Sequence, residues 1–360
     1  MDKRLVGKWY KEALGETVNI FDETPPRMKL SFASSGYYNV APNCVYLDGD
    51  DLCYEINDEL FRMVYHLHYE NGRMCGYCTQ FGKETPVVYE KQSDIPEDGD
   101  YRYAPTILVP EADESRIDLL TAYGGYAPGG CPIPESTYAL NGTPPEVLSE
   151  YGFEACFAGI PAQSDQIAFA ALDFVCDHFG HDGSGGMGDS GTIAGLIAFC
   201  ETHNGRMNCR GLAILLASIL RLKGVKARHI TCKPYEEPFT DCHVVVDCLL
   251  PSGRRVMLDP TNRLYYTDQQ GEPVSLRRLR ELLIAGEALR HNPEASYNKG
   301  PFDAAGNRAY MIKNTFRFSR GFHFCDGADE DSMDLIPAKY VEKQRKGRAF
   351  TTDDADFWKI

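Results

Sequence analysis

The sequence predicts an α+β protein in which a small antiparallel β-barrel precedes a mixed domain of helices and an antiparallel sheet. Residues 1–92 hold many short strand-like runs with Gly, Asn and Asp between them, which is typical of a small barrel. Residues 205–224 form the longest helical pattern, and alternating runs follow at 225–232, 242–250 and 255–258. We therefore expect a barrel at 1–92, an irregular linker or site-covering segment at 93–163, the mixed domain at 164–300 and a C-terminal extension packing on the core at 301–360.

Composition restricts the class of protein. The 360 residues suffice for two domains or three, and 43% hydrophobic with 25% charged residues is typical of a soluble globular chain. A formal net charge of −15 argues against nucleic acid or an anionic membrane as the main partner. There is no apolar run of about 20 residues, and the N-terminus becomes polar before a signal-peptide core could form. We expect a cytoplasmic protein.

The 13 cysteines are odd in number and scattered along the chain, which in a reducing compartment predicts mostly free thiols. Cys75 and Cys78 form the one CxxC pair, and no second pair stands at zinc-site spacing. We therefore expect no metal and no cofactor.

The N-terminal part carries the period-two pattern of half-buried strands. In residues 61–69, Phe, Met, Tyr, Leu and Tyr alternate with more polar residues. The opening Leu5-Val6-Gly7-Lys8-Trp9 resembles the G-x-W start of lipocalin-like barrels, in which the tryptophan closes one barrel end. The resemblance implies the architecture, and it leaves open whether the barrel takes a small ligand.

The central part reads as helices and a glycine-rich loop. Helical patterns cover 165–178 and 192–202, each carried by regularly spaced apolar residues. Between them, 180–188 holds five glycines and His181 but no Walker lysine, so we expect a loop near the active site rather than a phosphate site. Later, 275–288 predicts a basic amphipathic helix, and 309–319 is strand-like.

A cysteine stands at the front of the long helical stretch. Asn208 suits an N-cap, which places Cys209 in the first helical turn. There the unpaired backbone N–H groups and the helix dipole favour thiolate over thiol. Taken alone, such a cysteine is more often a buried inert side chain than a nucleophile.

A histidine and an aspartate follow on the predicted strands. Pairing about a centre near residue 251 or 252 brings Asp259 within a residue or two of the position opposite His243. Asp241 and Asp247 are rival partners for the histidine. Asp247 is disfavoured, because it lies roughly 13 Å further along the same strand.

Several short segments carry a family resemblance over about 165–290. They are Met207-Asn208-Cys209-Arg210, the Arg221-to-Arg228 helix-to-strand link, Cys242-His243-Val244-Val245 and Met257-Leu258-Asp259-Pro260-Thr261. The chain resembles the transglutaminase-like superfamily, in particular its bacterial members. The resemblance implies a papain-like fold in which a Cys-bearing helix packs on an antiparallel sheet, and it implies Cys209, His243 and Asp259 as the catalytic triad.

The chain also departs from that family. No tryptophan lies between Trp9 and Trp358, so the upstream tryptophan that helps to hold the oxyanion in true transglutaminases is missing. The backbone N–H of Cys209 suits one oxyanion donor, and Asn208, Asn204 and Gln163 are candidates for the second.

This reasoning predicts a thiol-nucleophile enzyme acting on amide bonds, peptide or glutamine, of a peptide or protein substrate. Passing the acyl group to water makes a peptidase or amidase, and passing it to an amine makes a transglutaminase. The alternative is a catalytically inactive transglutaminase-like protein that serves as a binding or scaffold module.

Overall fold

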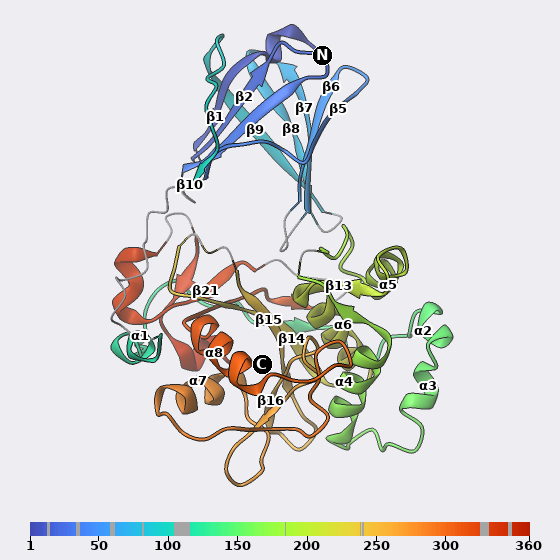
Figure 1. The fold of residues 1–360 in the computed structure, drawn as a ribbon. Coiled ribbons are helices and arrows are strands. Elements are labelled where there is room, and N and C mark those ends of the chain that lie inside the picture. The colour runs from blue at the N-terminus through green and yellow to red at the C-terminus, as the bar shows by residue number, and fades with distance from the viewer. Residues whose placement is uncertain are drawn as a thin grey trace. The chain divides into compact units, whose positions relative to one another are not determined.

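The computed structural model divides into two compact units, one made of the N-terminal strands and the other of the remaining helices and sheets (Figure 1). Phe61 of the alternating run and Cys325 lie outside the described residues. The structure describes residues 1–12, 15–33, 37–57, 62–80, 83–103, 116–183, 185–237, 239, 241–324, 331–344 and 348–360.

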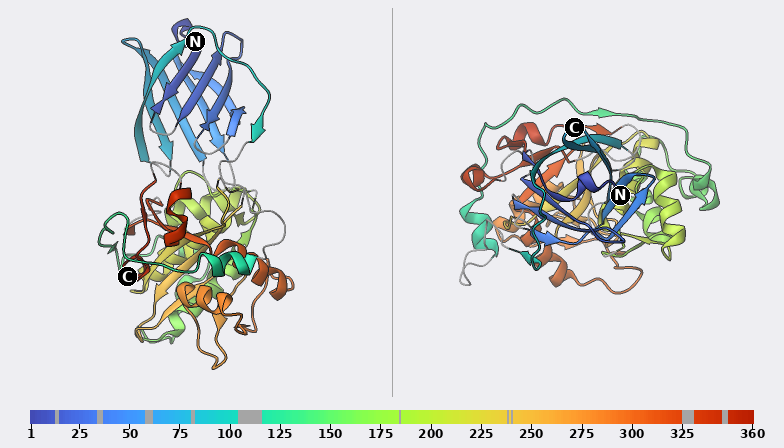
Figure 2. Two further views of the ribbon diagram at one scale, coloured as in Figure 1. Left: turned by 90° about the vertical axis from the view of Figure 1, so that its left-hand side faces the viewer. Right: turned by 90° about the horizontal axis from the view of Figure 1, so that it is seen from above.

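The first unit is a curled antiparallel sheet in the order β10-β4-β3-β2-β1-β9-β8-β7-β6-β5 (Figure 2). Consecutive strands pair as hairpins from β1 to β4 and from β5 to β9, while β1 also pairs with β9 and β10 pairs with β4. Among the described residues β4 and β5 share no ladder, so the sheet forms a half-barrel with edges at β10 and β5. The strands are β1 (Gly7–Lys11), β2 (Glu16–Phe21), β3 (Arg27–Phe32), β4 (Tyr37–Val40), β5 (Cys44–Asp48), β6 (Asp51–Asn57), β7 (Arg62–Glu70), β8 (Arg73–Gln80), β9 (Lys83–Ser93) and β10 (Arg102–Tyr103).

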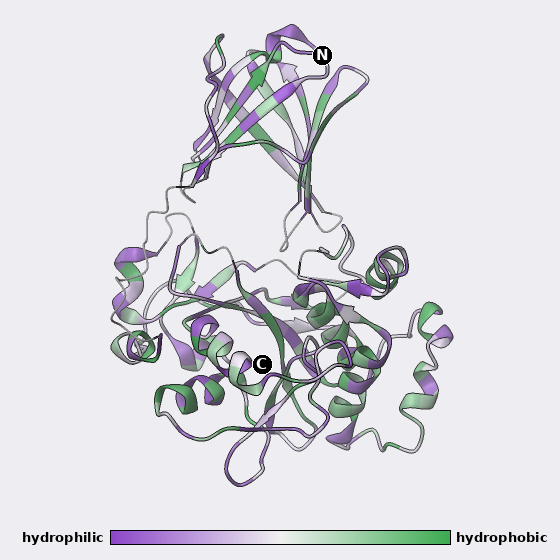
Figure 3. Ribbon diagram, in the orientation of Figure 1, coloured by the Kyte–Doolittle hydropathy of each residue, from purple (hydrophilic) through white to green (hydrophobic). Residues whose placement is uncertain are grey.

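The inner face of this sheet is filled by side chains. Hydrophobic and hydrophilic residues are interspersed along its strands, because successive side chains point to opposite faces (Figure 3). Trp9 is fully buried and donates its indole N–H to the carbonyl of Leu5, at the short 3-10 helix Lys3–Leu5, at 2.7 Å. Glu16 is also fully buried, and it accepts a hydrogen bond from the Tyr89 hydroxyl at 3.0 Å. Burial raises the pKa of Glu16, which favours its neutral form in this core.

The second unit is built on a six-stranded sheet in the order β16-β15-β14-β19-β21-β22. Its pairings are antiparallel except for that of β21 with β22. The strands are β14 (Lys226–Lys233), β15 (His243–Leu249), β16 (Arg255–Leu258), β19 (Arg317–Arg320), β21 (Met333–Leu335) and β22 (Phe350–Thr351).

Three pairs of two-residue strands accompany this sheet. They are β11 (Thr137–Tyr138) with β20 (His323–Phe324), β12 (Gly180–His181) with β13 (Arg206–Met207), and β17 (Tyr266–Thr267) with β18 (Arg290–His291). The helices are α1 (Arg116–Ala122), α2 (Val147–Glu150), α3 (Phe153–Cys156), α4 (Gln166–His178), α5 (Ile193–Thr202), α6 (Cys209–Leu222), α7 (Leu276–Ile284), α8 (Ala304–Asn314), the 3-10 helix Ala338–Lys343 and α9 (Asp354–Phe357).

Helices cover both faces of this sheet. Helix α6 lies against β14 and β15, and its Arg210 bonds the Thr231 hydroxyl of β14 at 2.8 Å. Ile230 and Cys232 point to the opposite face because side chains alternate along a strand. There they pack in one core with four leucines of α7 and with Met311 of α8.

Two elements differ from the sequence predictions. The amphipathic helix expected over 275–288 ends at Ile284, and Gly286 follows with a left-handed backbone (φ 67°) that stops it. The strand expected over 309–319 is mostly helix α8, followed by β19. Asp303 caps α8 by accepting from the Gly306 N–H at 2.9 Å, and this signal outweighs the apparent alternation.

In the part of the chain that is described, no helix combines the length and the apolar character needed to cross a membrane.

Candidate active site

Cys209 is the first residue of α6, as its sequence position predicts. The Asn208 side chain caps the helix, because its Oδ1 accepts from the Gly211 N–H at 2.9 Å. The Asn208 N–H in turn donates to the carbonyl of Gly186 at 2.8 Å. The cysteine is 8% exposed, so the thiol lies just beneath the surface at the positive end of the helix dipole.

His243 begins β15 and contacts Asp259. Its Nε2 lies 2.9 Å from Asp259 Oδ2, and both side chains are buried. The carboxylate is held further by the Thr261 N–H and by the Asn262 side-chain amide, each at 2.9 Å. Since Nε2 is engaged with Asp259, Nδ1 is the ring nitrogen left to exchange a proton with a thiol.

The strand register explains how Asp259 reaches the ring. Val246 pairs with Leu258 and Leu249 with Arg255, so the β15–β16 hairpin is centred on Ser252, as predicted. Strand β16 ends at Leu258, and Asp259 begins a turn closed by its own backbone bonds to Leu264. Asp259 therefore lies just beyond the paired part of β16, and its carboxylate reaches His243 at the start of β15.

The two rival aspartates are occupied elsewhere. Asp247 is fully buried and pairs with Arg228 at 3.0 Å and with Arg255. Asp241 accepts from the Tyr310 hydroxyl at 2.8 Å and pairs with Lys313 at 2.6 Å. The Tyr310 ring packs edge-on against His243, with centroids 5.4 Å apart, so this aspartate anchors a neighbour of the imidazole.

The electrostatics of the three groups favour an ion pair. Burial by itself raises the pKa of the Cys209 thiol, but hydrogen bonds with His181 and His243 and their charge outweigh it and lower the pKa to about 6. Burial opposes the charged form of His243, yet the Asp259 carboxylate and the Cys209 thiolate raise the pKa of the ring to about 10. Burial also acts against the Asp259 carboxylate, while the His243 charge holds its pKa below the usual range. Thiolate and imidazolium are thus the favoured forms near neutral pH.

Other cysteines of the chain behave oppositely. Burial raises the pKa of the following thiols: Cys53, Cys75, Cys156, Cys176, Cys200, Cys232, Cys242 and Cys248. Cys209 is set apart from them by its two histidines.

His181 was not predicted as a site residue, and it contributes to the lowered pKa of Cys209. It lies on β12, which pairs in parallel with β13 so that His181 stands opposite Met207, two residues before Cys209. Asn298 clamps its backbone: the side-chain Oδ1 accepts from the His181 N–H at 2.7 Å, and Nδ2 donates to the His181 carbonyl at 3.0 Å. The His181 Nδ1 lies 3.1 Å from the Tyr297 hydroxyl, which leaves Nε2 for the thiol.

The sequence matches no known family model and no curated protein. Among solved structures, the chain is similar to a putative protease from Parabacteroides distasonis. The two are 14% identical with a TM-score of 0.23, and the match covers 56% of this chain and 39% of that one.

The three oxyanion candidates differ in their surroundings. Asn208 adjoins the thiol in sequence, and because its Oδ1 accepts the helix-cap hydrogen bond, a donor role would fall to its Nδ2 group. Asn204 is exposed and has a left-handed backbone (φ 55°) in the turn before β13, and Gln163 is exposed ahead of α4. Their roles stay predictions.

Proposed function

We propose that this protein is a thiol-dependent enzyme that cleaves or exchanges amide bonds, with Cys209 as the nucleophile, His243 as the base and Asp259 as its orienting partner. The observation that carries the proposal is the environment of Cys209: a thiol at a helix N-terminus with two histidines, one of them held by a buried carboxylate. The sequence resemblance to the transglutaminase-like superfamily supports the same assignment.

The first half-reaction follows from the proposed protonation states. The Cys209 thiolate attacks the amide carbonyl carbon, and the carbonyl π electrons move to oxygen to give a tetrahedral oxyanion. When that intermediate collapses, the C–N bond breaks and imidazolium His243 delivers its proton to the leaving amine. The products of this step are a free amine, a neutral His243 and a thioester on Cys209.

The second half-reaction returns the enzyme to its starting state. Neutral His243 takes a proton from water or from an incoming amine, which attacks the thioester and releases Cys209 as thiolate. Asp259 holds the ring orientation and stabilises its positive charge throughout. Water gives hydrolysis, and an amine gives transamidation.

Two groups suit the developing oxyanion. The backbone N–H of Cys209 lies in the first turn of α6, where N–H groups have no helical acceptor. His181 is the second. Its ring forms a hydrogen bond with the Cys209 side chain, and because Nδ1 contacts the Tyr297 hydroxyl, Nε2 is the nitrogen that can donate. We place it alongside Asn208, Asn204 and Gln163 as a candidate donor.

Selective alkylation tests the nucleophile. Iodoacetamide at pH 6 should label Cys209 ahead of the other cysteines, and His243→Ala should remove that preference. The background should carry Cys44→Ser, Cys131→Ser and Cys325→Ser, since the first two are exposed competitors and the third lies outside the described residues. Peptide mapping identifies the labelled site, and slow uniform labelling of all cysteines would refute the proposal.

Substrate assays then separate turnover from the inactive alternative. An N-blocked glutamine peptide is incubated with a fluorescent primary amine, and a mixture of unstructured peptides is incubated without one. Amine incorporation identifies a transglutaminase, and new peptide termini identify a peptidase. A protein that alkylates selectively at Cys209 but supports neither reaction on any peptide or protein substrate is the binding or scaffold module.

A further inference from the structure

Helix α8 supplies a side chain that contacts both His243 and the residues just before it. The Tyr310 ring lies edge-on to the imidazole, with centroids 5.4 Å apart and ring planes at 64°. Its hydroxyl donates to Asp241 Oδ1 at 2.8 Å and lies 2.9 Å from the backbone carbonyl oxygen of Cys242. Burial raises the pKa of Tyr310, so the hydroxyl keeps its proton at neutral pH and remains a donor. One side chain thus contacts the imidazole ring and the start of the strand that carries it.

A second residue of α8 fixes the carboxylate that Tyr310 binds. Lys313 stands three positions after Tyr310, so the two side chains are neighbours on one face of the helix. The Lys313 ammonium pairs with Asp241 Oδ2 at 2.6 Å, while the tyrosine bonds Oδ1. The Lys313 and Asp241 side chains are 29% and 37% exposed, so this ion pair orients the carboxylate and contributes little to stability.

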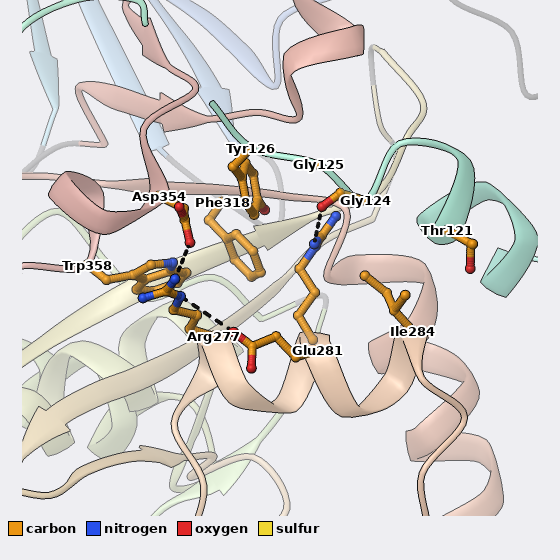
Figure 4. Close-up of a pocket in the computed structure, with 11 residues that line it drawn as sticks. Thr121, Gly124, Gly125, Tyr126, Arg277, Glu281, Ile284, Phe318, Asp354 and Trp358 are labelled. Atoms are coloured by element: carbon orange, nitrogen blue, oxygen red, sulfur yellow. Dashed lines mark hydrogen bonds and ion pairs between the residues drawn. The ribbon is translucent and has the colours of Figure 1, made fainter. Parts of the chain in front are cut away.

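Helix α8 is itself fixed at both ends and along one side. Asp303 caps its N-terminus, and at its C-terminus the Thr315 carbonyl accepts from the Arg280 guanidinium of α7 at 2.9 Å. Arg280 is one of the residues that line a cavity of about 430 Å³ beside α7 (Figure 4). Met311 packs in the core that also holds the leucines of α7. The position of Tyr310 is therefore set by the packing of the second unit as well as by its own hydrogen bonds.

The imidazole of His243 needs a second restraint to stay aligned with the thiol. The ring turns about two side-chain bonds, and the hydrogen bond from Nε2 to Asp259 fixes only one of its atoms. A swing of the ring about that contact would carry Nδ1 away from Cys209. An aromatic edge packed against the ring opposes the swing, because two close-packed side chains cannot occupy the same space.

We propose that Tyr310 is a positioning residue, which holds His243 so that Nε2 stays on Asp259 and Nδ1 faces Cys209. This role rests on the proposed function, which identifies the reacting pair. It adds a group from α8, beyond the segments that resemble the transglutaminase-like superfamily. Tyr310 exchanges no proton with the substrate: it increases the fraction of time for which base and thiol are aligned.

Two substitutions separate the Tyr310 ring from its hydroxyl. Tyr310→Phe keeps the ring and removes the anchoring hydrogen bonds, and Tyr310→Leu removes the ring as well. We expect the rate of Cys209 alkylation at pH 6 to fall about threefold in the Phe variant and about tenfold in the Leu variant, because a displaced imidazolium stabilises the thiolate less. In amide turnover kcat should fall by similar factors while KM stays within about twofold, since the base is misaligned and the substrate contacts are kept.

Proton NMR of the full chain with 15N-labelled histidine reads the alignment without turnover. The proton that His243 Nε2 donates to Asp259 is buried and should give a sharp downfield resonance, identified among the nine histidines by its loss in His243→Gln. The resonance should broaden and exchange faster with water in Tyr310→Leu, and less so in Tyr310→Phe. A parent protein that shows the resonance but neither selective alkylation nor turnover would refute the proposed function alone.

Tyr266→Phe is the matched control. The Tyr266 hydroxyl is buried and donates to Asn307 Oδ1 of α8 at 2.6 Å, so this change removes a hydrogen bond to the same helix but none to residues 241–243. The urea midpoint should fall by a similar amount in Tyr266→Phe and Tyr310→Phe, whereas only Tyr310→Phe should slow alkylation and broaden the His243 resonance.

Two results would overturn the positioning role. One is a Tyr310→Leu protein whose alkylation rate and His243 resonance equal those of the parent. The other is a Tyr266→Phe protein in which both change as much as in Tyr310→Phe, which would indicate a general loosening of α8. If Tyr310→Leu does not fold, the comparison of the two Phe variants decides.

Discussion

The ionisation of Cys209 should be visible in the pH dependence of its reactions. Its thiolate fraction grows as pH rises through a pKa of about 6, so the alkylation rate should reach half its plateau there. Amide turnover also needs imidazolium His243, which is lost as pH rises through about 10. We therefore expect turnover to be bell-shaped, with limbs near 6 and 10. An alkylation midpoint of about 8.5, the value of an ordinary cysteine, would contradict this.

Asp259→Asn provides the matched test of the ion pair. An amide keeps the shape of the carboxylate but removes the charge that raises the pKa of His243. The upper limb of the turnover profile should move to lower pH, and the alkylation midpoint should move to higher pH because a less charged ring stabilises thiolate less. Asp247→Asn is the control: it also removes a buried carboxylate, but one paired with Arg228, and should leave both limbs in place.

His181 should act on the same thiol independently of His243. Replacing it by Phe keeps a ring on β12 but removes its hydrogen bond, so the alkylation midpoint should rise by about one pH unit. Tyr297→Phe should raise the midpoint less, because it removes only the partner that orients the ring. His203→Phe is the control, since His203 follows α5 and bonds Thr202 and Phe199 instead. An unchanged midpoint in His181→Phe would assign this histidine a merely structural role.

The contrast between His243 and His181 shows how far site prediction from sequence can reach. Cys209 and His243 are marked by local patterns, a capped helix start and a strand start. His181 is placed by a two-residue strand pair and by Asn298, which is 117 positions away. No local pattern records such a clamp, so the glycine-rich stretch predicts only a loop near the site.

At the scale of elements, the sequence predicts a helix accurately where an N-cap residue stands directly before a run of apolar residues with helical spacing. Thr192 caps α5 and Asn208 caps α6 by accepting from the N–H three residues on. The strand prediction was wrong for 309–314, because Ala309 and Met311 fit both a strand and a helix pattern and only the Asp303 cap distinguishes them, whereas 317–319 is strand β19. The sequence pattern also could not show that β4 and β5, although consecutive along the chain, share no ladder among the described residues, since alternation marks a strand but not its partner.

Helix α6 should not tolerate a larger residue at Gly211. Alanine normally stabilises a helix interior relative to glycine by about 1 kcal/mol. Here its Cβ would lie 2.6 Å from Met207 Sδ and 2.9 Å from Met187 Cβ, so the overlap should reverse the sign. We expect Gly211→Ala to destabilise the protein by about 1–3 kcal/mol in urea unfolding and to slow alkylation of Cys209. Gly183→Ala, whose Cβ would make an ordinary 3.6 Å contact with His181, should be close to neutral.

At the scale of the whole molecule, the two units have separate hydrophobic cores. Trp9 is buried in the core of the first unit, and Trp358 in that of the second. These are the only tryptophans of the chain. Each therefore reports on one core, which allows the stability of the two units to be measured in a single protein.

Two variants test whether each core has its own stability. Trp9→Phe leaves Trp358 as the sole tryptophan reporter, and Trp358→Phe leaves Trp9. Because each core is built from its own residues, we expect the two to unfold at different urea concentrations. The preferential alkylation of Cys209 at pH 6 should be lost at the same urea concentration as the native Trp358 fluorescence, since α6 and the sheet it packs on belong to that unit. Coincident fluorescence transitions in both variants, together with loss of labelling at the same concentration, would show one cooperative unit instead.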